Sequence, residues 1–592
     1  MSTLRFCKVY SLLITLALNA TSVAGASFLN ATRSYQEGDY ESAHSSFLEL
    51  AEQGDSRAMN VLGLIYQHGH GVNADDAMAV VWFRKAANLG LASAQNNLGV
   101  MYLRGLGVER DYAQATHWYR LAAEQGDKNA QNNLGFMLAL GEGVKIDDVE
   151  AVYWYLQAAE QDHPVAQDNL GLMYTLGRGV EKDHEEAMRW YLRSAANDDP
   201  NGQFHAGSMY LQGQGATSDL EQAVHWLGKA AEQGHSNAQE TLAYLYYQGE
   251  GVTVDLDKAA QYYHKAARAG RAGAQFNLGV LFEKGQGVEQ DLSQALEWFL
   301  LAAAQQHSHA QYSVARAYEH GQGTETNLEL AFDWYLSAAQ QDHLASQFQV
   351  ASMLNQGRGA AQNKAEALRW YARAGEQGLD TAQFIAARMY ANGIGTKADA
   401  ETAVKWYRMA AHDGYADAQF DLAFMYYRGL GVDQDYAQAA SWYELAALQG
   451  HRGAQFNLAL MNDKGLGANS NPELALHWYR EAAKLGSLEA QYQLALKLFN
   501  FEGDAIDPSQ ARVWMTRAAE GGFTKAKLAV GLLYSRGLGF ERDLVKSYAW
   551  LSAAADDGNA VALEHRDAIV RQLDVNALAD AETLAQKLIQ DP

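Results

Sequence analysis

Seven aromatic residues follow one another at intervals of 36 residues between positions 276 and 492. Aromatic side chains offer large, rigid apolar surfaces, and a row of them suits the binding of an extended peptide or a glycan. We therefore treat this row as the first candidate for a binding function. Its members are Phe276, Tyr312, Phe348, Phe384, Phe420, Phe456 and Tyr492.

Two arginines accompany the row, because Arg316 and Arg388 each stand four residues after one of its aromatics. The planar guanidinium group binds carboxylates and phosphates through two parallel hydrogen bonds. In a chain with an excess of acids, an arginine beside an aromatic surface is therefore a candidate anchor for an anionic group. The alternative is that both arginines are solvated charges with local acidic partners such as Glu319.

Five histidines share another position of the same 36-residue period. A metal ion would need its ligands about 2.1 Å from one centre. Equivalent positions on packed neighbouring helices lie about 8–10 Å apart, so these histidines cannot bind one ion together. We expect solvated loop residues and no metal site. The five are His163, His235, His307, His343 and His451.

Motifs of catalysis and nucleotide binding are missing from the sequence. It has no H-E-x-x-H, no G-x-S-x-G, no P-loop and no EF-hand spacing. G-x-G recurs throughout the chain, but never as G-x-G-x-x-G after a strand. Cys7 is the only cysteine. We therefore expect a protein that is not an enzyme, with no catalytic residues, no metal and no cofactor.

The elements that position the aromatic row follow from a strict repeat. A small residue, nearly always alanine, recurs every 36 residues in fourteen consecutive units, and Ala562 continues the register. A period of this length predicts a solenoid, in which each unit covers the apolar face of its neighbour. The repeat residues are Ala58, Ala94, Ala130, Ala166, Gly202, Ala238, Ala274, Ala310, Ser346, Ala382, Ala418, Ala454, Ala490 and Ala526.

Each unit reads as a helical hairpin. In the unit that begins at Ala94, apolar residues recur at helical spacing as far as Tyr102. Gly105 and Gly107 end this helix, since glycine is the usual residue after a helix C-terminus. A second helical pattern then runs to Gly126. The sequence thus predicts two helices per unit, with small residues where they approach each other.

Two further positions of the unit have structural explanations. The position of Asp111 is Asp or Asn in all fourteen units, as expected of an N-cap that accepts hydrogen bonds from a first helical turn. All thirteen tryptophans share a single position, and Tyr262 occupies it in the remaining unit. Tryptophans in such register indicate a packing layer between units. We therefore assign neither set to ligand binding.

These residues carry a family resemblance. The pattern A-Q-x-N-L-G-x-x-Y-x-x-G-x-G-V-x-x-D-x-x-x-A-x-x-W-Y-x-x-A-A-x-x-G, over about residues 58–558, resembles the Sel-1-like repeat, a relative of the tetratricopeptide repeat. The resemblance implies a right-handed α/α superhelical solenoid and a protein-interaction scaffold, common in bacterial envelope and secreted proteins. Some cysteine-rich relatives resemble β-lactamases in activity, but this chain lacks their cysteines.

By analogy with tetratricopeptide packing, the second residue after each repeat alanine faces a concave groove. In the first four units this residue is polar, and from the seventh to the thirteenth unit it belongs to the aromatic row. The row then forms a ladder along the groove and binds the partner. The alternative is that the rings pack between neighbouring first helices. The polar members are Asn60, Asn96, Asn132 and Asp168.

The ends of the chain differ from the repeat. Residues 1–26 read as a cleavable signal peptide, with Arg5 and Lys8 before a short apolar run and a small-residue site at the end. A retained membrane anchor is the alternative. Residues 27–57 and 559–592 are expected to be capping segments, as solenoids require for solubility. Phe501 replaces the first loop glycine of unit thirteen and predicts an altered junction there.

Charge and export complete the functional expectation. The formal net charge is −24, which repels phosphate backbones and makes nucleic-acid binding unfavourable. We expect an exported protein, periplasmic or secreted, without a membrane-spanning segment once the signal is cleaved. Its function would be that of a non-catalytic scaffold that binds a protein partner in the groove. A glycan partner, and a β-lactamase-like enzyme, are the alternatives.

Overall fold

The computed structural model describes residues 23–499 and 508–590, and all of its regular elements in these ranges are helices. The 32 helices confirm the predicted all-α class. The chain divides into two compact units, with the boundary between Ala310 and Gln311. The predicted irregular junction at Phe501 lies outside the described residues, as do residues 1–22 of the predicted signal peptide.

The first unit comprises a starting hairpin and the repeats before the division. Its helices are α1 (Val23–Gln36), α2 (Tyr40–Glu52), α3 (Ser56–His68), α4 (Asp76–Asn88), α5 (Ala92–Arg104), α6 (Tyr112–Glu124), α7 (Lys128–Leu140), α8 (Asp148–Glu160), α9 (Pro164–Leu176), α10 (His184–Ala196), α11 (Pro200–Gln212), α12 (Leu220–Glu232), α13 (Ser236–Gln248), α14 (Leu256–Arg268), α15 (Ala272–Lys284) and α16 (Leu292–Ala304).

The second unit contains the remaining repeats and the C-terminal helices. Helix α17 (Ser308–His320) crosses the division in the chain. After it come α18 (Leu328–Gln340), α19 (Leu344–Gln356), α20 (Lys364–Glu376), α21 (Asp380–Asn392), α22 (Ala400–His412), α23 (Ala416–Arg428), α24 (Tyr436–Leu448), α25 (Arg452–Lys464), α26 (Pro472–Lys484), α27 (Leu488–Leu498), α28 (Pro508–Glu520), α29 (Thr524–Arg536), α30 (Leu544–Asp556), α31 (Ala560–Val570) and α32 (Val575–Gln590).

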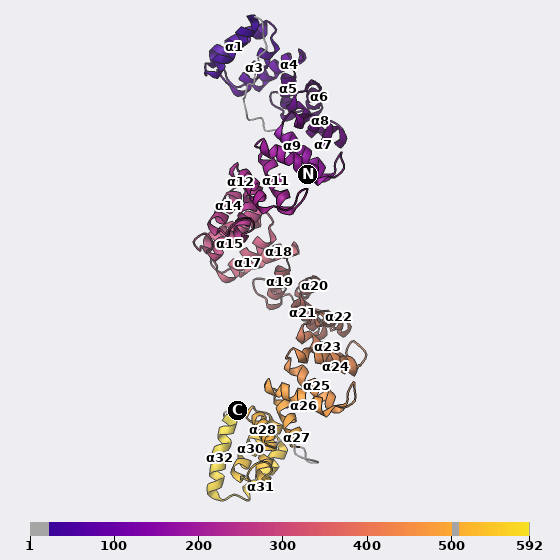
Figure 1. The fold of residues 1–592 in the computed structure, drawn as a ribbon. Coiled ribbons are helices and arrows are strands. Elements are labelled where there is room, and N and C mark those ends of the chain that lie inside the picture. Colours follow the sequence, from indigo (N-terminus) through magenta and orange to yellow (C-terminus); the bar gives the residue numbers. More distant parts are fainter. Residues whose placement is uncertain (1–22, 500–507, 591–592) are drawn as a thin grey trace. The chain divides into compact units, whose positions relative to one another are not determined.

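Each repeat from α3 to α30 is a hairpin of an odd-numbered helix, which we call helix A, and the following even-numbered helix B. Within each unit, helix B packs against helix A of its own repeat and against helix A of the next repeat (Figure 1). The hairpins thus follow one another in chain order. This arrangement confirms the predicted α/α solenoid.

The Asp or Asn position caps helix B as predicted. In the second repeat the Asp111 side chain accepts a hydrogen bond from the backbone N–H of Gln114 at 3.0 Å. Asn327 does the same for Leu330 in the eighth repeat, also at 3.0 Å. The equivalent Asp507 lies outside the described residues.

The two loop glycines have different tasks. Gly141 ends α7 with φ = 75°, the left-handed backbone of a usual helix C-terminus. Gly143 also has positive φ, but an added Cβ there would lie 2.2 Å from the carbonyl carbon of Tyr112, on helix B of the preceding repeat. The first glycine therefore ends a helix, and the second permits the close approach of two repeats.

The tryptophans pack as predicted, since all thirteen are buried or half-buried. Trp154, for example, belongs to a cluster that joins α6, α7 and α8 to α9. Within the same cluster the Tyr119 ring is fully buried against helix A of its own repeat, where Gly99 leaves room for it. Tryptophan thus contributes to the core along the array.

A buried glutamine links successive helices, a role that the sequence pattern did not reveal. The side-chain amide of Gln131 donates to the carbonyl of Ala123 at the end of the preceding helix B, at 3.2 Å. Its own carbonyl oxygen accepts from Gln161, at the end of helix B in the same repeat, at 2.8 Å. Where Leu485 replaces this second glutamine, the buried Oε1 of Gln455 has no hydrogen-bond partner in the described part of the chain.

The ends carry helices that lack the repeat pattern. Helices α1 and α2 form a hairpin against α3, and α31 continues the register of the helices A with Asn559 as its N-cap. Helix α32 packs against α30. Among the described residues, none of these helices, nor any other, combines the length and apolar character needed to cross a bilayer.

Candidate functional site

The seven aromatics of the predicted row, which we call the aromatic ladder, all lie on helices A and are half-buried. In six repeats the ring packs against an aromatic ring on helix B of the same repeat. The ring centroids of Phe348 and Tyr371 are 5.5 Å apart, and those of Phe420 and Tyr443 are 5.6 Å apart. One side of each such ring is therefore part of the protein interior.

Several ladder rings also contact the residue that precedes helix A of the next repeat. The Phe420 ring stacks on His451 with centroids 4.5 Å apart, and the Phe384 ring lies 5.1 Å from Tyr415. The ladder thus fills space between consecutive repeats and keeps part of each ring accessible. This combines features of both sequence interpretations, packing between repeats and an accessible surface.

The prediction that the five in-register histidines are solvated loop residues is wrong. Each is an N-cap of a helix A, and the Nδ1 atom of His163 accepts from the Ala166 N–H at 3.1 Å. Burial, together with the nearby Lys128, lowers the pKa of His163 to about 4. The signal was readable, because Asp55 and Asp127 occupy the equivalent position in other repeats and cap in the same way.

No group of three His, Cys, Asp or Glu side chains in residues 23–499 and 508–590 is arranged to hold a metal ion. The five histidine side chains instead cap helices, and four of them also lie against an aromatic ring of the preceding helix A. His451 caps α25 while it stacks on Phe420. Its position is thus explained by the packing of neighbouring repeats.

In the first unit the polar equivalents of the aromatic ladder form hydrogen bonds between consecutive helices A. The acceptor is the second residue after the alanine of one repeat. The donor is the third residue after the alanine of the next repeat. We call this set the polar ladder. Its asparagine pairs are Asn97 to Asn60 at 3.0 Å, Asn133 to Asn96 at 3.0 Å, and Asn169 to Asn132 at 3.1 Å.

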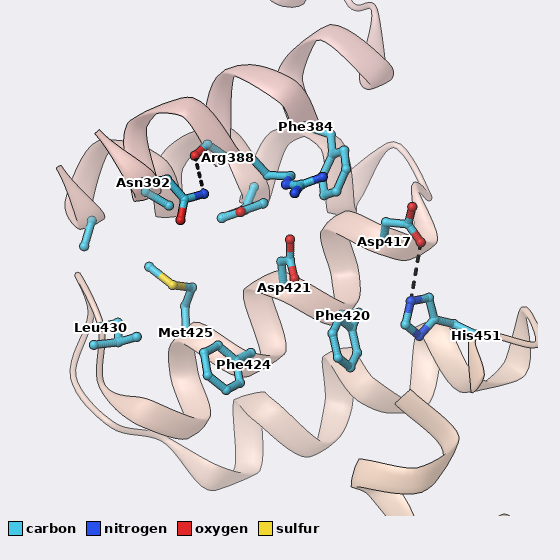
Figure 2. Close-up of a pocket in the computed structure, with 13 residues that line it drawn as sticks. Phe384, Arg388, Asn392, Asp417, Phe420, Asp421, Phe424, Met425, Leu430 and His451 are labelled. Carbon is cyan, nitrogen blue, oxygen red and sulfur yellow. Dashed lines mark hydrogen bonds and ion pairs between the residues drawn. The ribbon is translucent and has the colours of Figure 1, made fainter. Parts of the chain in front are cut away.

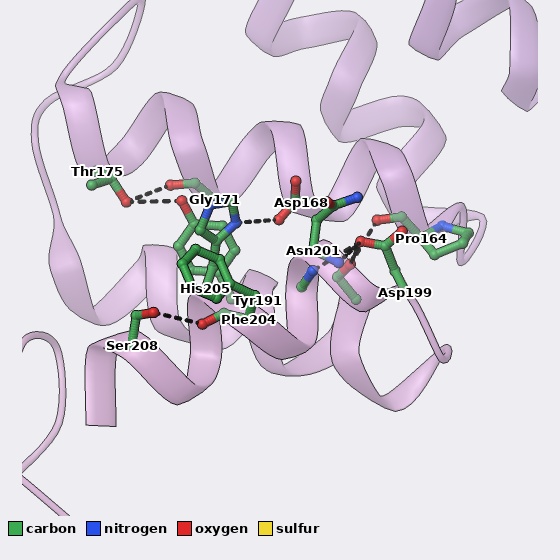
Figure 3. A network of polar contacts seen from close by, with 12 residues as sticks. Pro164, Asp168, Gly171, Thr175, Tyr191, Asp199, Asn201, Phe204, His205 and Ser208 are labelled. Carbon is green, nitrogen blue, oxygen red and sulfur yellow. Dashed lines mark hydrogen bonds and ion pairs between the residues drawn. The ribbon is translucent and has the colours of Figure 1, made fainter. Parts of the chain in front are cut away.

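The polar ladder continues into an acid–histidine pair (Figure 3). The Asp168 carboxylate lies 2.7 Å from Nδ1 of His205, and its side chain is only 3% exposed. Here the consecutive helices α9 and α11 contact each other directly. Asn132 and Asp168 are both buried. In these repeats the second position after the alanine is thus closed to a partner.

The two candidate arginines have different surroundings. Glu319, proposed as a local partner of Arg316, instead accepts a hydrogen bond from the Tyr335 hydroxyl at 2.8 Å and pairs with Arg358 at 2.9 Å. Arg388 is exposed on α21, and its guanidinium group lies 5.7 Å from the Phe384 ring centroid. Within the described residues, the Arg388 side chain forms no ion pair.

Arg388 lines a cleft of about 600 Å³ between α21 and α23 (Figure 2). We call it the Arg388 cleft. It brings together three of the nine predicted residues, Phe384, Arg388 and Phe420. The other six do not line it: Phe276, Tyr312, Arg316, Phe348, Phe456 and Tyr492.

The floor of the cleft contains a carboxylate that the sequence analysis missed. Burial raises the pKa of Asp421, while a hydrogen bond from the Tyr407 hydroxyl and the charge of Arg388 act in the opposite direction. Burial, followed by the charge of Asp421, also raises the pKa of Tyr407. One turn earlier, Asp417 lies 3.4 Å from Nε2 of His451. The cleft therefore offers separate positive and negative groups.

The identity of Asp421 contained a signal. Five other repeats have asparagine at its position, and the Asn457 side chain hydrogen-bonds the Tyr443 hydroxyl as Asp421 does Tyr407. An acid there is an exception in the second unit that position-by-position comparison of the repeats could have found. The asparagines are Asn97, Asn133, Asn169, Asn277 and Asn457.

The apolar end of the cleft is formed by exposed side chains. Phe424 is 42% exposed and Leu430 is 43% exposed, and Met425 lies beside them on the cleft wall. Large apolar side chains at a concave site commonly contact a ligand. The cleft thus combines an apolar end, two partly accessible ladder rings, a guanidinium group and carboxylates.

Comparisons with known proteins identify the family of the chain. The Sel1 repeat model matches fourteen times, at residues 56–91, 92–127, 128–163, 164–199, 200–235, 236–270, 272–307, 308–343, 344–379, 381–415, 416–451, 453–487, 488–523 and 524–559. No curated protein matches the chain.

Two solved structures illustrate the likeness. A protective antigen of uropathogenic Escherichia coli strains, which displays an SLR fold, is 31% identical with a TM-score of 0.55. That match covers 86% of this chain and 94% of the antigen. A Sel1 repeat protein from Oxalobacter formigenes is also 31% identical, with a TM-score of 0.42, over 52% of this chain and 89% of its own. The chain therefore belongs to the Sel1 repeat family.

Proposed function

We propose that the protein is an exported, non-catalytic scaffold that binds a partner protein on the helices A of its second unit. Repeat solenoids of the Sel1 and tetratricopeptide type are generally protein-interaction scaffolds. The partner contacts the aromatic ladder at the Arg388 cleft. The signal-like residues 1–26 support export to the periplasm or beyond.

The observation that carries the proposal is the composition of the Arg388 cleft. Protein interfaces are typically built around a few aromatic and arginine side chains at the centre of a concave, partly apolar surface. Phe384, Arg388 and Phe420 provide such a centre, and Phe424 adds exposed apolar area beside it. The polar ladder of the first unit offers no equivalent, because Asn132 and Asp168 are buried.

A related protein supports the cellular setting. The Escherichia coli relative is described as a protective antigen, a description that fits a protein accessible at the surface of the bacterium. The same setting for this chain agrees with the signal-like N-terminus. We therefore place the partner in the cell envelope or outside the cell.

A glycan partner receives less support from the geometry. Sugars stack on the open faces of aromatic rings, because these faces are flat apolar surfaces. The Phe420 ring instead stacks on His451 and packs against Tyr443. One face of this ring is thus covered within the protein, which favours contact of its remaining accessible part with side chains of a protein partner over stacking by a sugar ring.

Capture of the partner by crosslinked pull-down from the native cell envelope tests the proposal. The double variant Phe384→Ser/Phe420→Ser is expected to lose the partner that the unchanged protein captures. Tyr153→Ser is the matched control, since Tyr153 is 52% exposed on α8 and belongs to the first unit. Equal capture by all three proteins, with unchanged helical circular dichroism, would contradict the proposal.

A further inference from the structure

Arg388 and Asp421 face each other across the cleft from two consecutive helices A (Figure 2). The Arg388 guanidinium forms no ion pair within the described residues, although the two groups are close enough for the charge of Arg388 to influence Asp421. The carboxylate interacts with the Tyr407 hydroxyl, and its two oxygens have more acceptor sites than this single hydroxyl can fill. The cleft thus presents a donor opposite an acceptor.

A peptide group is the natural complement of such a pair, because it carries one acceptor, the C=O, and one donor, the N–H. An extended chain has both groups free for a partner, whereas a helix uses them in its own i to i−4 hydrogen bonds. The spatial separation of donor and acceptor on α21 and α23 therefore favours an extended segment over a helix as the occupant.

We propose that the Arg388 cleft binds an extended peptide segment of the partner through its main chain. Arg388 donates to a peptide carbonyl, and Asp421 accepts from a peptide N–H of the same segment. An apolar side chain of the segment packs at the end of the cleft lined by Phe424, Met425 and Leu430. This inference rests on the proposed function and names the kind of partner that the scaffold binds.

The apolar end gives the segment its side-chain preference. Phe424 and Leu430 expose about two-fifths of their surface each, and covering them removes apolar area from water. Met425 also lines the cleft, and the unbranched methionine side chain suits apolar groups of different shape. We therefore expect a preference for a large apolar residue such as leucine, methionine or phenylalanine, without a requirement for one particular residue.

The choice of aspartate at position 421 agrees with a binding role. Asparagine, the residue of five other repeats, keeps the hydrogen bond with the tyrosine of the preceding helix B without placing a charge in the interior. Because Asp421 is half-buried, its carboxylate loses part of its hydration, which disfavours the charged form. An ionised carboxylate gains stronger hydrogen bonds to N–H donors than an amide does, and the segment supplies such a donor.

The test uses the full chain and a bead library of random dodecapeptides with acetylated and amidated ends. Selected peptides are resynthesised with single N-methylated amides, and their Kd is measured by fluorescence anisotropy. N-methylation removes one N–H and leaves the side chains unchanged. At the amide that meets Asp421, we expect it to weaken binding about tenfold or more.

Variants of the cleft provide the second arm. Arg388→Met keeps an unbranched apolar stem beside Phe384 and removes the donor, so binding should weaken about tenfold or more. Asp421→Leu should weaken it similarly, and Asp421→Asn, which retains an oxygen acceptor, should restore part of the affinity. Because Arg388 is exposed, the variant Arg388→Met is expected to melt at the same temperature as the unchanged protein.

The outcomes separate this inference from the proposed function. Main-chain recognition would be overturned if neither N-methylation nor Arg388→Met changed the affinity of the selected peptides. Peptides that bind as helices would overturn it as well. So would a library without any peptide that depends on Arg388. If Phe384→Ser/Phe420→Ser still abolishes capture of the native partner in these cases, the scaffold function stands and only the extended-segment inference fails.

Discussion

The fourth repeat should become less stable at acidic pH because of His163. Replacement of His163 by asparagine should abolish this pH dependence. His163 is 4% exposed, and its Nδ1 atom accepts the Ala166 N–H as the N-cap of α9. Protonation of Nδ1 ends this acceptor role and places a charge in the interior. Asparagine caps helices as well as any residue and does not titrate, so the variant keeps the cap without the pH dependence.

The size of the effect follows from the pKa of His163. Burial and Lys128 lower it from 6.5 to about 4 in the folded protein. Between these values the unfolded chain binds a proton that the folded chain does not, so stability falls as the pH falls from 6.5 towards 4. At about 1.4 kcal/mol for each pH unit, the full loss is about 3 kcal/mol. The variant should lack it.

Hydrogen exchange followed by mass spectrometry reads this local stability directly. Peptides that cover Pro164–Leu176 are compared between pH 7 and pH 4.5, after correction for intrinsic exchange rates. Asp127 and Asp199, whose pKa values burial raises, titrate in both proteins and cancel in the difference. His117→Asn, an exposed site on α6, serves as the control.

Equal protection of α9 at both pH values in the unchanged protein would contradict this role of His163. Retention of the full pH dependence by His163→Asn would contradict it as well. A variant that is already much less protected at pH 7 would instead show that asparagine fails to replace the histidine cap.

Three further predictions concern single positions. Leu485→Gln should stabilise the protein by about 1 kcal/mol, seen as a higher urea midpoint, because it supplies the hydrogen-bond donor that Gln455 lacks; no gain would contradict this explanation. Asp421→Asn should raise the Tm at pH 7 but not at pH 3, since the raised pKa of Asp421 means that its stability contribution is lost as the pH rises through the folded-state value. An equal effect at both pH values would exclude a charge effect. Gly143→Ala should destabilise by about 3 kcal/mol in denaturant titrations, because its Cβ would lie 2.2 Å from Tyr112, whereas Gly126→Ala, with open space around it, should lose only about 1 kcal/mol. Equal losses would refute the close-approach role of Gly143.

Local features of the fold were predictable because they depend on residues close in sequence. The cap at Asp111 and the helix end at Gly141 follow from side-chain chemistry and backbone freedom within a few residues. The 36-residue period then extends each local rule along the array. The histidine caps obey the same logic, because His163 occupies the same repeat position as the capping residues Asp55 and Asp127.

Features that depend on the spacing between repeats were not predictable from one unit. Whether the second residue after the repeat alanine is accessible depends on how closely consecutive helices A approach. Asn132 is buried because Asn169 hydrogen-bonds to it from the next repeat, 37 residues later. Phe384 and Phe420 instead open into one cleft. The contrast between asparagine and aromatic was visible in the sequence, but its geometric consequence was not.

The same reason explains the incomplete site prediction. Arg388 and two ladder rings were identified by their types and spacing, and the structure brings them together. Asp421 and Phe424 lie within four residues of Phe420. They become recognisable as parts of a site only when the position of α21 opposite α23 is known. A side chain on one repeat therefore cannot be assigned to a site without the position of its neighbour.

Site-specific photocrosslinking tests the central claim most directly. A photoreactive phenylalanine analogue is placed at position 424 in the Arg388 cleft or at position 153 on α8, both of which carry exposed side chains in the unchanged protein. The proteins are irradiated in cells that express the chain naturally. Partner-protein adducts at position 424 but not at position 153, and their loss with Arg388→Met, are the predicted result. Adducts of equal yield at both positions, or none at position 424, would contradict the account.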